Sequence, residues 1–347
     1  MLFKKKRITV NLSLVFIITI MLLTLLSSCF NNDFDSDNIL NSDDNCAFTS
    51  NSEQGDADED GVGDACDSTS LIYMSERDGN PEIYMLNLID MNRTQLTQDN
   101  SISNFAPTWS PDGRLIAYHS KSSAREYFDI LVMERSGKNI RNLTESLSVA
   151  GDSYRPTWSP DGAQIAFQFD SELASNKLWI LNINNPQNAA NLISSSKQRH
   201  EHDPCWSPTG ESIVFTTETL DTNNRIYSLI LVDVLDKTEV KILTDSLRIW
   251  NAVFSADGQE VFFAKIVQQY FEIFSINLDG TNLRSIYKLE EGNVNEPSLS
   301  PRGDVMAFQF QADSDGESRD IAVLDLKSNV ITRITTNGFV DGTPDLF

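Results

Sequence analysis

The stretch PTWSPDG at residues 107–113 recurs unchanged at residues 156–162, and this repetition decides the fold. Degenerate copies follow: PCWSPTG at 204–210, AVFSADG at 252–258, PSLSPRG at 297–303 and a truncated TPDLF at 343–347. The large apolar residues at the tryptophan position are 49, 48, 48, 45 and 47 residues apart, and they are Trp109, Trp158, Trp206, Phe254, Leu299 and Leu346. A period of about 40–50 residues is typical of repeat architectures such as propellers.

Each repeat has the same internal order of short apolar runs. In the first complete copy these are LIAYHS at 115–120, FDILVM at 128–133 and the weaker IRNLT at 140–144. Together with the strand that carries the motif, they predict four β-strands per unit, as in a propeller blade. The Asp-Gly pair between two such runs predicts a tight hairpin turn in which both central residues take positive φ.

The first unit is out of phase with the others. Residues 71–97 supply three strands without a motif, and TPDLF at the C-terminus supplies the motif without following strands. We therefore expect Thr343–Phe347 to form the innermost strand of the first blade and to close the ring. The predicted fold is all-β, a six-bladed β-propeller over residues 71–347 with four-stranded blades. Closure also covers strand edges that would otherwise promote aggregation.

The PTWSPDG copies, each followed by a run such as IAF at 165–167, resemble the repeat of TolB-type propellers. The resemblance extends from Leu71 to the end of the chain. It implies a six-bladed propeller that binds a protein at one face or at its central channel. In TolB-type proteins an α/β domain precedes the propeller in the chain, whereas in this sequence an acidic segment precedes it.

The N-terminus carries the pattern of an export signal. MLFKKKR is followed by an apolar run at residues 8–26, and LSSC closes it at residues 26–29. A basic start, an apolar stretch and small residues predict a secretory signal over residues 1–28. The alternative is an uncleaved membrane-spanning helix. LSSC resembles the lipobox of bacterial lipoproteins, which implies a lipid on Cys29 and a bacterial cell-envelope location. Phe30 in place of Asp implies the outer membrane, with the periplasmic or surface side left open.

The chain is strongly acidic, with a formal net charge of −23. Removal of the signal takes away four basic residues and no acids, which leaves about −27. Such a field repels the phosphate backbone, so we expect no nucleic-acid partner.

Residues 29–70 form an acidic spacer. Residues 31–67 contain twelve Asp and Glu and few large apolar side chains, so this composition predicts a disordered chain unless a metal orders it. Two stretches have the oxygen-ligand spacing of twelve-residue calcium loops. The predicted ligands are Asp33, Asp35, Asp37, the Ile39 carbonyl, Asn41 and Asp44 in the first loop, and Asp56, Asp58, Asp60, the Val62 carbonyl, Asp64 and Asp67 in the second. Gly61 at the sharp-turn position favours the second loop.

A calcium sensor of the EF-hand type requires amphipathic helices on both sides of the loop, and this sequence predicts none there. Residues 44–67 instead resemble the thrombospondin type 3 repeat, with the pattern DNC followed by DADEDGVGDACD. The resemblance implies calcium bound along an irregular chain and a disulfide between Cys46 and Cys66. The alternative is a solvated acidic linker without metal.

Signs of catalysis are few. The sequence has no GxSxG motif, and its three histidines are His119, His200 and His202. HEHDPC at residues 200–205 has residue types that hold transition metals, so a metal-assisted polysaccharide lyase or hydrolase is the alternative function. Otherwise this segment is expected to be a polar entry loop. Cys205 is expected to be a small buried apolar residue.

A better candidate site lies just before the repeat proline, where each innermost strand begins near one mouth of the channel. Aromatic and charged side chains recur at these positions, as they do in interaction sites. The residues singled out for partner binding are Phe105, Tyr154, Arg155, His202, Asp203, Trp250, Asn251 and Glu296. We therefore predict a monomeric, non-enzymatic binding protein for a protein or glycan, with calcium as its only cofactor. A propeller that serves only as an envelope scaffold is a further alternative.

Overall fold

The computed structural model describes residues 70–347, apart from residues 148, 172–173, 193–198, 222–223, 313–315, 317 and 337, together with the single residues 39, 43, 52 and 54. Residues 1–67 and 68–347 are separate units. The predicted signal, the lipidation site Cys29, the disulfide Cys46–Cys66 and all predicted calcium ligands except Ile39 lie outside the described residues. Within the described part of the chain, no helix is long and apolar enough to cross a membrane.

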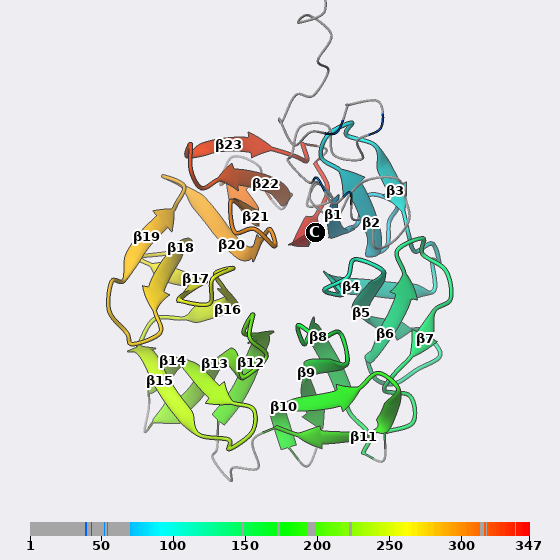
Figure 1. Ribbon diagram of the computed structural model, residues 1–347, viewed down its shortest axis with the longest axis horizontal. Helices are drawn as coiled ribbons and strands as arrows, with labels where there is room; N and C mark the ends of the chain where they lie inside the picture. Colours follow the sequence, from blue (N-terminus) through cyan, green and yellow to red (C-terminus); the bar gives the residue numbers. More distant parts are fainter. Residues whose placement is uncertain are drawn as a thin grey trace, which may run out of the picture. The chain divides into compact units, whose positions relative to one another are not determined.

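Six four-stranded antiparallel sheets form a ring, as the repeat period predicts (Figure 1). We number them as blades 1 to 6 in chain order. The strands of blades 1 to 3 are β24 (Asp341–Leu346), β1 (Ser70–Ser75), β2 (Glu82–Asn87) and β3 (Arg93–Gln95); β4 (Ile102–Trp109), β5 (Leu115–Ser122), β6 (Asp129–Glu134) and β7 (Arg141–Asn142); β8 (Asp152–Trp158), β9 (Gln164–Ser171), β10 (Ala174–Asn182) and β11 (Asn185–Asn191).

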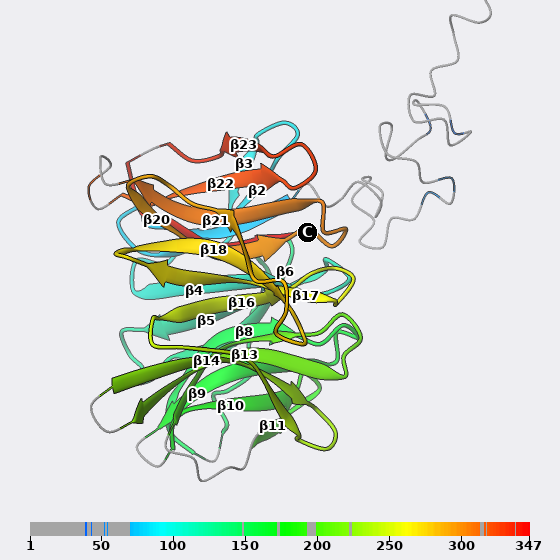
Figure 2. The same ribbon diagram turned by 90° about the vertical axis from the view of Figure 1, so that its left-hand side faces the viewer.

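The strands of blades 4 to 6 follow the same order. They are β12 (Arg199–Trp206), β13 (Ser212–Asp221), β14 (Asn224–Asp233) and β15 (Glu239–Asp245); β16 (Ile249–Phe254), β17 (Glu260–Val267), β18 (Tyr270–Asn277) and β19 (Arg284–Tyr287); β20 (Gly292–Leu299), β21 (Val305–Ala312), β22 (Asp320–Asp325) and β23 (Val330–Arg333). The strand that carries each motif copy lies innermost (Figure 1), and Figure 2 shows the same ring from the side.

Blade 1 is closed by the C-terminal strand, as predicted. β24 pairs antiparallel with β1, with Leu71 opposite Leu346 and Ile72 opposite Asp345. The last residue continues this pairing, because Ser70 and Phe347 exchange two backbone hydrogen bonds of 3.1 and 2.9 Å. The two ends of the propeller therefore share one sheet.

The SPDG turn differs from the predicted hairpin. Gly113 has a φ of +67°, but Asp112 is not in the positive-φ region. The Gly113 N–H donates to the Ser110 carbonyl over 2.9 Å, and the Ser110 hydroxyl donates to Asp112 and accepts the Leu115 N–H. The turn is thus held by the serine and aspartate side chains, and only the glycine needs the left-handed conformation.

Each innermost strand contains a β-bulge at the residue before the repeat proline. In blade 2, Phe105 pairs with His119 and Thr108 pairs with Ala117, so the inner strand holds one extra residue. The extra residues have φ between 44° and 53°, and they are Ala106, Arg155, Asp203, Asn251, Glu296 and Thr343. Proline follows in five of the six copies, and it is tolerated at a bulge because no ladder bond needs its missing N–H.

Six apolar clusters hold the ring together, one between each pair of neighbouring blades. The motif tryptophan packs on the preceding blade: Trp158 of β8 lies against Ile130 and Val132 of β6. Its indole N–H also donates to the Thr108 carbonyl of β4 over 3.2 Å. The tryptophan position therefore joins blades, which explains why it stays large and apolar in every copy.

Candidate functional site

The six bulges bring side chains from every blade to one small cavity on the ring axis, here called the inner cavity. Its volume is about 240 Å³. Each blade contributes to its wall the bulge residue and the next residues along the strand, for example Ala106, Pro107 and Thr108 in blade 2. The lining side chains used below are Arg155, Asp203, Asn251, Glu296, Thr343 and Asp345.

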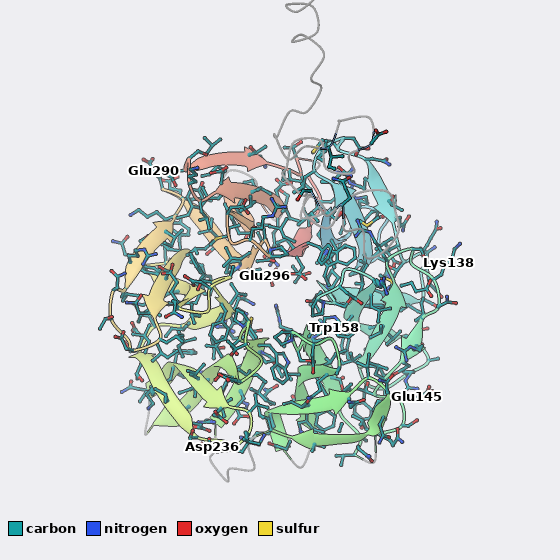
Figure 3. All side chains as sticks on the ribbon, viewed as in Figure 1. Lys138, Glu145, Trp158, Asp236, Glu290 and Glu296 are labelled. Carbon is teal, nitrogen blue, oxygen red and sulfur yellow. The ribbon has the colours of Figure 1, made fainter. Side chains whose placement is uncertain are left out.

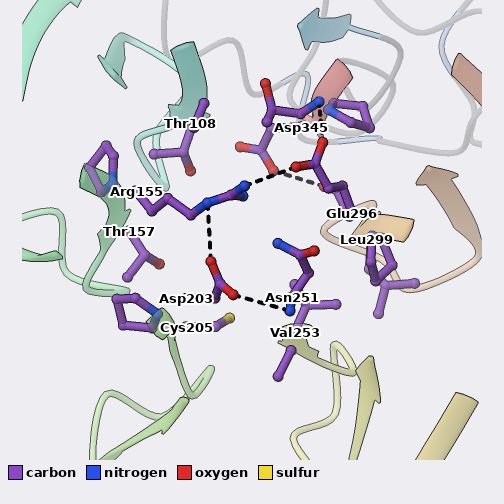
Figure 4. Close-up of a pocket in the computed structure, with 18 of the residues that line it drawn as sticks. Thr108, Arg155, Thr157, Asp203, Cys205, Asn251, Val253, Glu296, Leu299 and Asp345 are labelled. Atoms are coloured by element: carbon purple, nitrogen blue, oxygen red, sulfur yellow. Dashed lines mark hydrogen bonds and ion pairs between the residues drawn. The ribbon is translucent and has the colours of Figure 1, made fainter. Parts of the chain in front are cut away.

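Arg155 crosses the inner cavity and joins three blades (Figure 4). Its Nε lies 3.1 Å from Asp203 Oδ1 and its Nη2 lies 3.0 Å from Glu296 Oε1. Burial alone lowers the pKa of Arg155, but the two carboxylates outweigh burial and the pKa is raised. Arg155 is therefore a fixed cation between two fixed anions.

The same carboxylates accept backbone N–H groups of the next bulges. Asp203 Oδ2 accepts the Asn251 N–H at 3.3 Å, and Glu296 Oε2 accepts the Thr343 N–H at 2.7 Å. The bulges expose these donors because their strand pairing is interrupted. The carboxylates thus stabilise both Arg155 and the strained backbone around it.

Asp345 of β24, in blade 1, also lines the inner cavity. It accepts the Trp109 N–H and the Ser298 hydroxyl, both at 2.8 Å. Burial raises the pKa of Asp345 despite these hydrogen bonds. Within the described part of the chain, two further oxygens of the lining, Asn251 Oδ1 and Thr343 Oγ1, are buried without a hydrogen-bond partner.

A second cavity of about 460 Å³, here called the vestibule, opens next to the inner cavity. The two cavities share four lining residues, namely Ala106, Arg155, Glu296 and Thr343. Glu296 lies near the centre of the ring, whereas the exposed charges Lys138, Glu145, Asp236 and Glu290 lie on its perimeter (Figure 3). The vestibule therefore adjoins the inner cavity near the centre of the ring, and the shared residues form the boundary between the two cavities.

Aromatic rings from blades 2 and 3 form one wall of the vestibule. Phe105 stacks on His119 with centroids 5.4 Å apart, and Tyr154 meets His119 edge-on at 5.5 Å. Phe128 lies 5.1 Å from Tyr154. Burial, followed by the Arg155 charge, lowers the pKa of His119 to about 3, so its ring is neutral. Its Nδ1 faces the Arg155 backbone N–H at 3.5 Å.

A stack of four planar groups forms the wall contributed by blades 4 and 5. The Arg248 guanidinium lies over the Trp250 ring at 3.9 Å from its centre, and the His202 ring is stacked on Trp250 with centroids 5.2 Å apart. His200 continues the stack 6.1 Å from His202. Burial, aided by His200 and Arg248, lowers the pKa of His202. Trp250 is thus packed against a guanidinium and an imidazole inside the protein.

All eight residues proposed from the sequence for partner binding line these two cavities. Phe105, Tyr154, His202 and Trp250 face the vestibule, and Asp203 and Asn251 face the inner cavity. The two remaining residues, Arg155 and Glu296, line both cavities. The aromatic residues pack against neighbouring blades as well, so they hold the mouth in shape and also form its surface.

The segment His200–Cys205 belongs to strand β12, so the expectation of a polar entry loop is wrong. Its side chains diverge. Glu201 is fully buried and pairs with Arg199 at 3.0 Å, whereas Asp203 enters the inner cavity. Burial raises the pKa of the Cys205 thiol to about 11. Among the described residues, no group of three or more His, Cys, Asp or Glu side chains is placed to hold a metal ion.

Sequence reasoning missed several residues of the vestibule. Gln168 of β9 and Gln309 and Arg319 of blade 6 line the vestibule, while Phe128 and Arg248 pack against its aromatic residues Tyr154 and Trp250. They lie outside the repeated motif, so the motif alignment could not reveal them. They are far from the bulges along the chain, and only the folding of the blades brings them to the vestibule.

Comparison with protein families supports the repeat assignment. A family model described as the TolB beta propeller domain matches residues 65–219 and 119–346, and a model of the thrombospondin type 3 repeat matches residues 28–54. The second match includes the first predicted calcium loop but ends before the second, which sequence reasoning had favoured. No curated protein sequence matches the chain significantly.

Solved structures with the same fold are distant in sequence. TolB from Acinetobacter baumannii is 14% identical with a TM-score of 0.62, over 80% of this chain and 66% of that chain. Hydrazine synthase from Kuenenia stuttgartiensis is 12% identical with a TM-score of 0.64, over 79% of this chain and 46% of that one. A chain of the nidogen/laminin complex is 10% identical with a TM-score of 0.58, over 80% and 97%. At such identities the likeness shows the fold alone.

Proposed function

Because this chain belongs to the TolB beta propeller domain family, we propose that its propeller is a non-enzymatic binding module that receives a segment of a partner protein in the vestibule. The observation that carries the proposal is the aromatic vestibule that adjoins a polar inner cavity. Interface centres combine aromatic anchors with a few fixed polar groups in this way. The side chains come from rigid strands, so little ordering cost is expected on binding.

A protein segment fits the vestibule better than a glycan. A sugar ring binds an aromatic side chain by lying flat on an open face, whereas the Trp250 ring already packs against the Arg248 guanidinium and the His202 ring. In blade 2, Phe105 is likewise stacked on His119. Ring edges and polar tips are what the vestibule offers, and these suit the side chains and backbone of a peptide.

The histidines also favour binding over catalysis. His119 is neutral and packed among aromatic rings, and His202 is stacked between His200 and Trp250. The remaining histidine has its Nδ1 3.1 Å from the Asn176 amide. None of these contacts joins a histidine to a hydroxyl or thiol nucleophile, as general-base catalysis requires.

The test is capture of partners by crosslinking in intact cells. Trp250→Ala should reduce the captured protein by about tenfold or more, which is typical of an interface anchor. Leu235→Ala is the matched control, because Leu235 is 92% exposed in a hairpin outside the vestibule. Arg155→Ala is unsuitable, since it would leave two buried carboxylates without their cation. Equal capture by Trp250→Ala and wild type would refute the proposal.

For the N-terminal unit we propose a lipid anchor at Cys29 and a calcium-stiffened spacer over residues 29–70, which hold the propeller at the bacterial envelope. The thrombospondin type 3 match and the acidic ligand spacing support this arrangement. Cys29→Ala should release the protein from the membrane fraction. Recovery of that variant with membranes would exclude lipid anchoring at this residue.

A further inference from the structure

The inner cavity is short of hydrogen-bond donors. Asn251 is 7% exposed and its Oδ1 has no partner within the described part of the chain, and Thr343 Oγ1 is in the same state. A buried oxygen without a donor is costly, and most such atoms in folded proteins find a partner. Both oxygens line the cavity, so a ligand there can supply the missing hydrogen bonds.

The cavity also lacks positive charge. Its lining contains the carboxyl groups of Asp203, Glu296 and Asp345 against the single guanidinium of Arg155. Arg155 forms ion pairs with two of them, but its single positive charge offsets only one negative charge. The raised pKa of Asp345 fits a carboxyl group that has no cation beside it. A group with several N–H donors and one positive charge would complement this wall.

A metal ion is a poorer complement than an organic cation. The described residues contain no group of three acidic, histidine or cysteine side chains placed around one point. Calcium needs six to eight oxygens, whereas an ammonium group needs about three acceptors. Neutral oxygens such as Asn251 Oδ1 and Thr343 Oγ1 can serve an ammonium together with one carboxylate.

The two cavities together have the shape for a long side chain. The inner cavity, at about 240 Å³, is smaller than the roughly 300–1,000 Å³ typical of small-molecule sites. It adjoins the aromatic vestibule, with which it shares four lining residues. A lysine has an apolar stem that packs on aromatic rings and a charged head that seeks acceptors.

We propose that the inner cavity binds a primary alkylammonium group, supplied by a lysine side chain of the partner segment that enters through the vestibule. Asn251 Oδ1, Thr343 Oγ1 and the Glu296 carboxylate are the acceptors. The lysine source rests on the proposed function, whereas the ammonium site itself does not. A free amine of the same chemistry, such as a polyamine, is the other possible source.

The ammonium site is tested on the purified full-length chain without any partner, by ligand-observed NMR and thermal shift. The probe is n-butylammonium, which carries both stem and head. Tetramethylammonium, which has the charge but no N–H donors, and 1-butanol, which has the stem but no charge, should bind about tenfold more weakly or not at all.

Variants locate the binding. Asn251→Gly keeps a residue suited to φ = +51° and removes the acceptor, so n-butylammonium should bind about tenfold more weakly. Asn282→Gly is the matched control, because it makes the same change at φ = +60° in an exposed residue between β18 and β19, outside both cavities. Asn251→Asp, which also tolerates positive φ, adds a charge and should bind more tightly. No binding of n-butylammonium, equal loss in Asn282→Gly, or calcium binding that replaces it would overturn the site.

The source is tested by acetylating the lysines of the cell extract before capture. Lysine insertion predicts that acetylation and excess n-butylammonium both reduce capture, and that Asn251→Gly reduces it while Asn282→Gly does not. If Trp250→Ala abolishes capture but acetylation leaves it unchanged, the vestibule function stands and the lysine assignment fails. If spermidine binds the purified chain more tightly than n-butylammonium and capture ignores acetylation, the source is a free polyamine.

Discussion

Removal of the last five residues, Thr343–Phe347, should prevent stable folding of the propeller. These residues include most of β24, which closes blade 1 against β1. Leu346 is 4% exposed within the apolar cluster between blades 6 and 1. The ring of Phe347 lies 5.6 Å from Trp109 of blade 2. The truncation therefore removes contacts with both neighbours of the closing blade.

The size of the effect follows from these contacts. Emptying a buried leucine site costs about 2–5 kcal/mol. Six hydrogen bonds are also lost, each worth about 1 kcal/mol net: the two between Ser70 and Phe347, one from Thr343, two to Asp345 and one from Leu346. The loss is on the order of 6 kcal/mol or more, which is comparable with the roughly 5–15 kcal/mol that stabilises a folded domain. We expect the truncated chain to be largely unfolded at 25 °C.

Circular dichroism during thermal and urea unfolding measures this loss, with hydrogen exchange at β1 as a local readout. The synthetic peptide DGTPDLF, added in excess, should restore part of the signal by occupying the vacated edge of β1. Leu346→Ala should lower stability by only the leucine part of the loss. A truncated protein that melts within a few degrees of the full chain would show that ring closure does not depend on the C-terminal strand.

Four further outcomes are expected. Ala106→Gly should raise stability by about 1 kcal/mol in urea unfolding, since alanine is strained at φ = +44°; a loss would mean that the bulge is not strained. Ser110→Ala should lower the free energy of unfolding by about 1–3 kcal/mol, because it leaves the Leu115 N–H without that acceptor; an unchanged value would show that the serine hydroxyl does not stabilise the turn. The pKa of Asp345 is raised by burial, so its ionisation destabilises the folded state as pH rises above 3.8. The melting temperature of Asp345→Asn relative to wild type should therefore be higher at pH 8 than at pH 4, and a constant difference would contradict this. Chelation of calcium should make residues 30–70 more sensitive to protease, and unchanged resistance would refute the stiffened spacer.

The blade count and the ring closure were predictable because both follow from a repeat that one can align by eye. Trp109, Trp158 and Trp206 mark successive blades, and the orphan TPDLF fits the gap in the first unit. The mouth position of the partner-binding candidates was predictable for the same reason. A residue at a fixed place in the repeat comes to a fixed place in the ring.

The bulge itself was not predictable from the motif. Only Asp203 and Asn251 among the six bulge residues are types that tolerate positive φ well. The surrounding blades impose the conformation, since the Asn251 and Thr343 N–H groups are bound by carboxylates of other blades. Such long-range stabilisation leaves no local signal in the sequence.

A second repeat, which the motif does not predict, is an acid–threonine hydrogen bond that joins the third and fourth strands of three blades. A buried acid at the start of the third strand accepts a threonine hydroxyl from the end of the fourth in the pairs Glu82–Thr97, Asp129–Thr144 and Asp320–Thr335. The same threonine accepts the N–H after the acid, at 2.9 Å in each case. The spacing of 15 residues is constant in these blades, but the fourth strands β3, β7 and β23 are too short for their sequence to predict this pairing.

Comparison of the internal repeats distinguishes the residues that build the ring, which recur from copy to copy, from the residues that line the channel, which vary. The proline recurs in five of six copies and the tryptophan position is always large and apolar, because these residues form the bulge and join the blades. The bulge residue changes in every copy, through Ala106, Arg155, Asp203, Asn251, Glu296 and Thr343. Since the backbone is similar at all six positions, the side chains there make the blades differ at the channel. Exchanges at positions whose side chains carry no ion pair between blades, such as Asn251, should therefore change the bound group while leaving the blades intact.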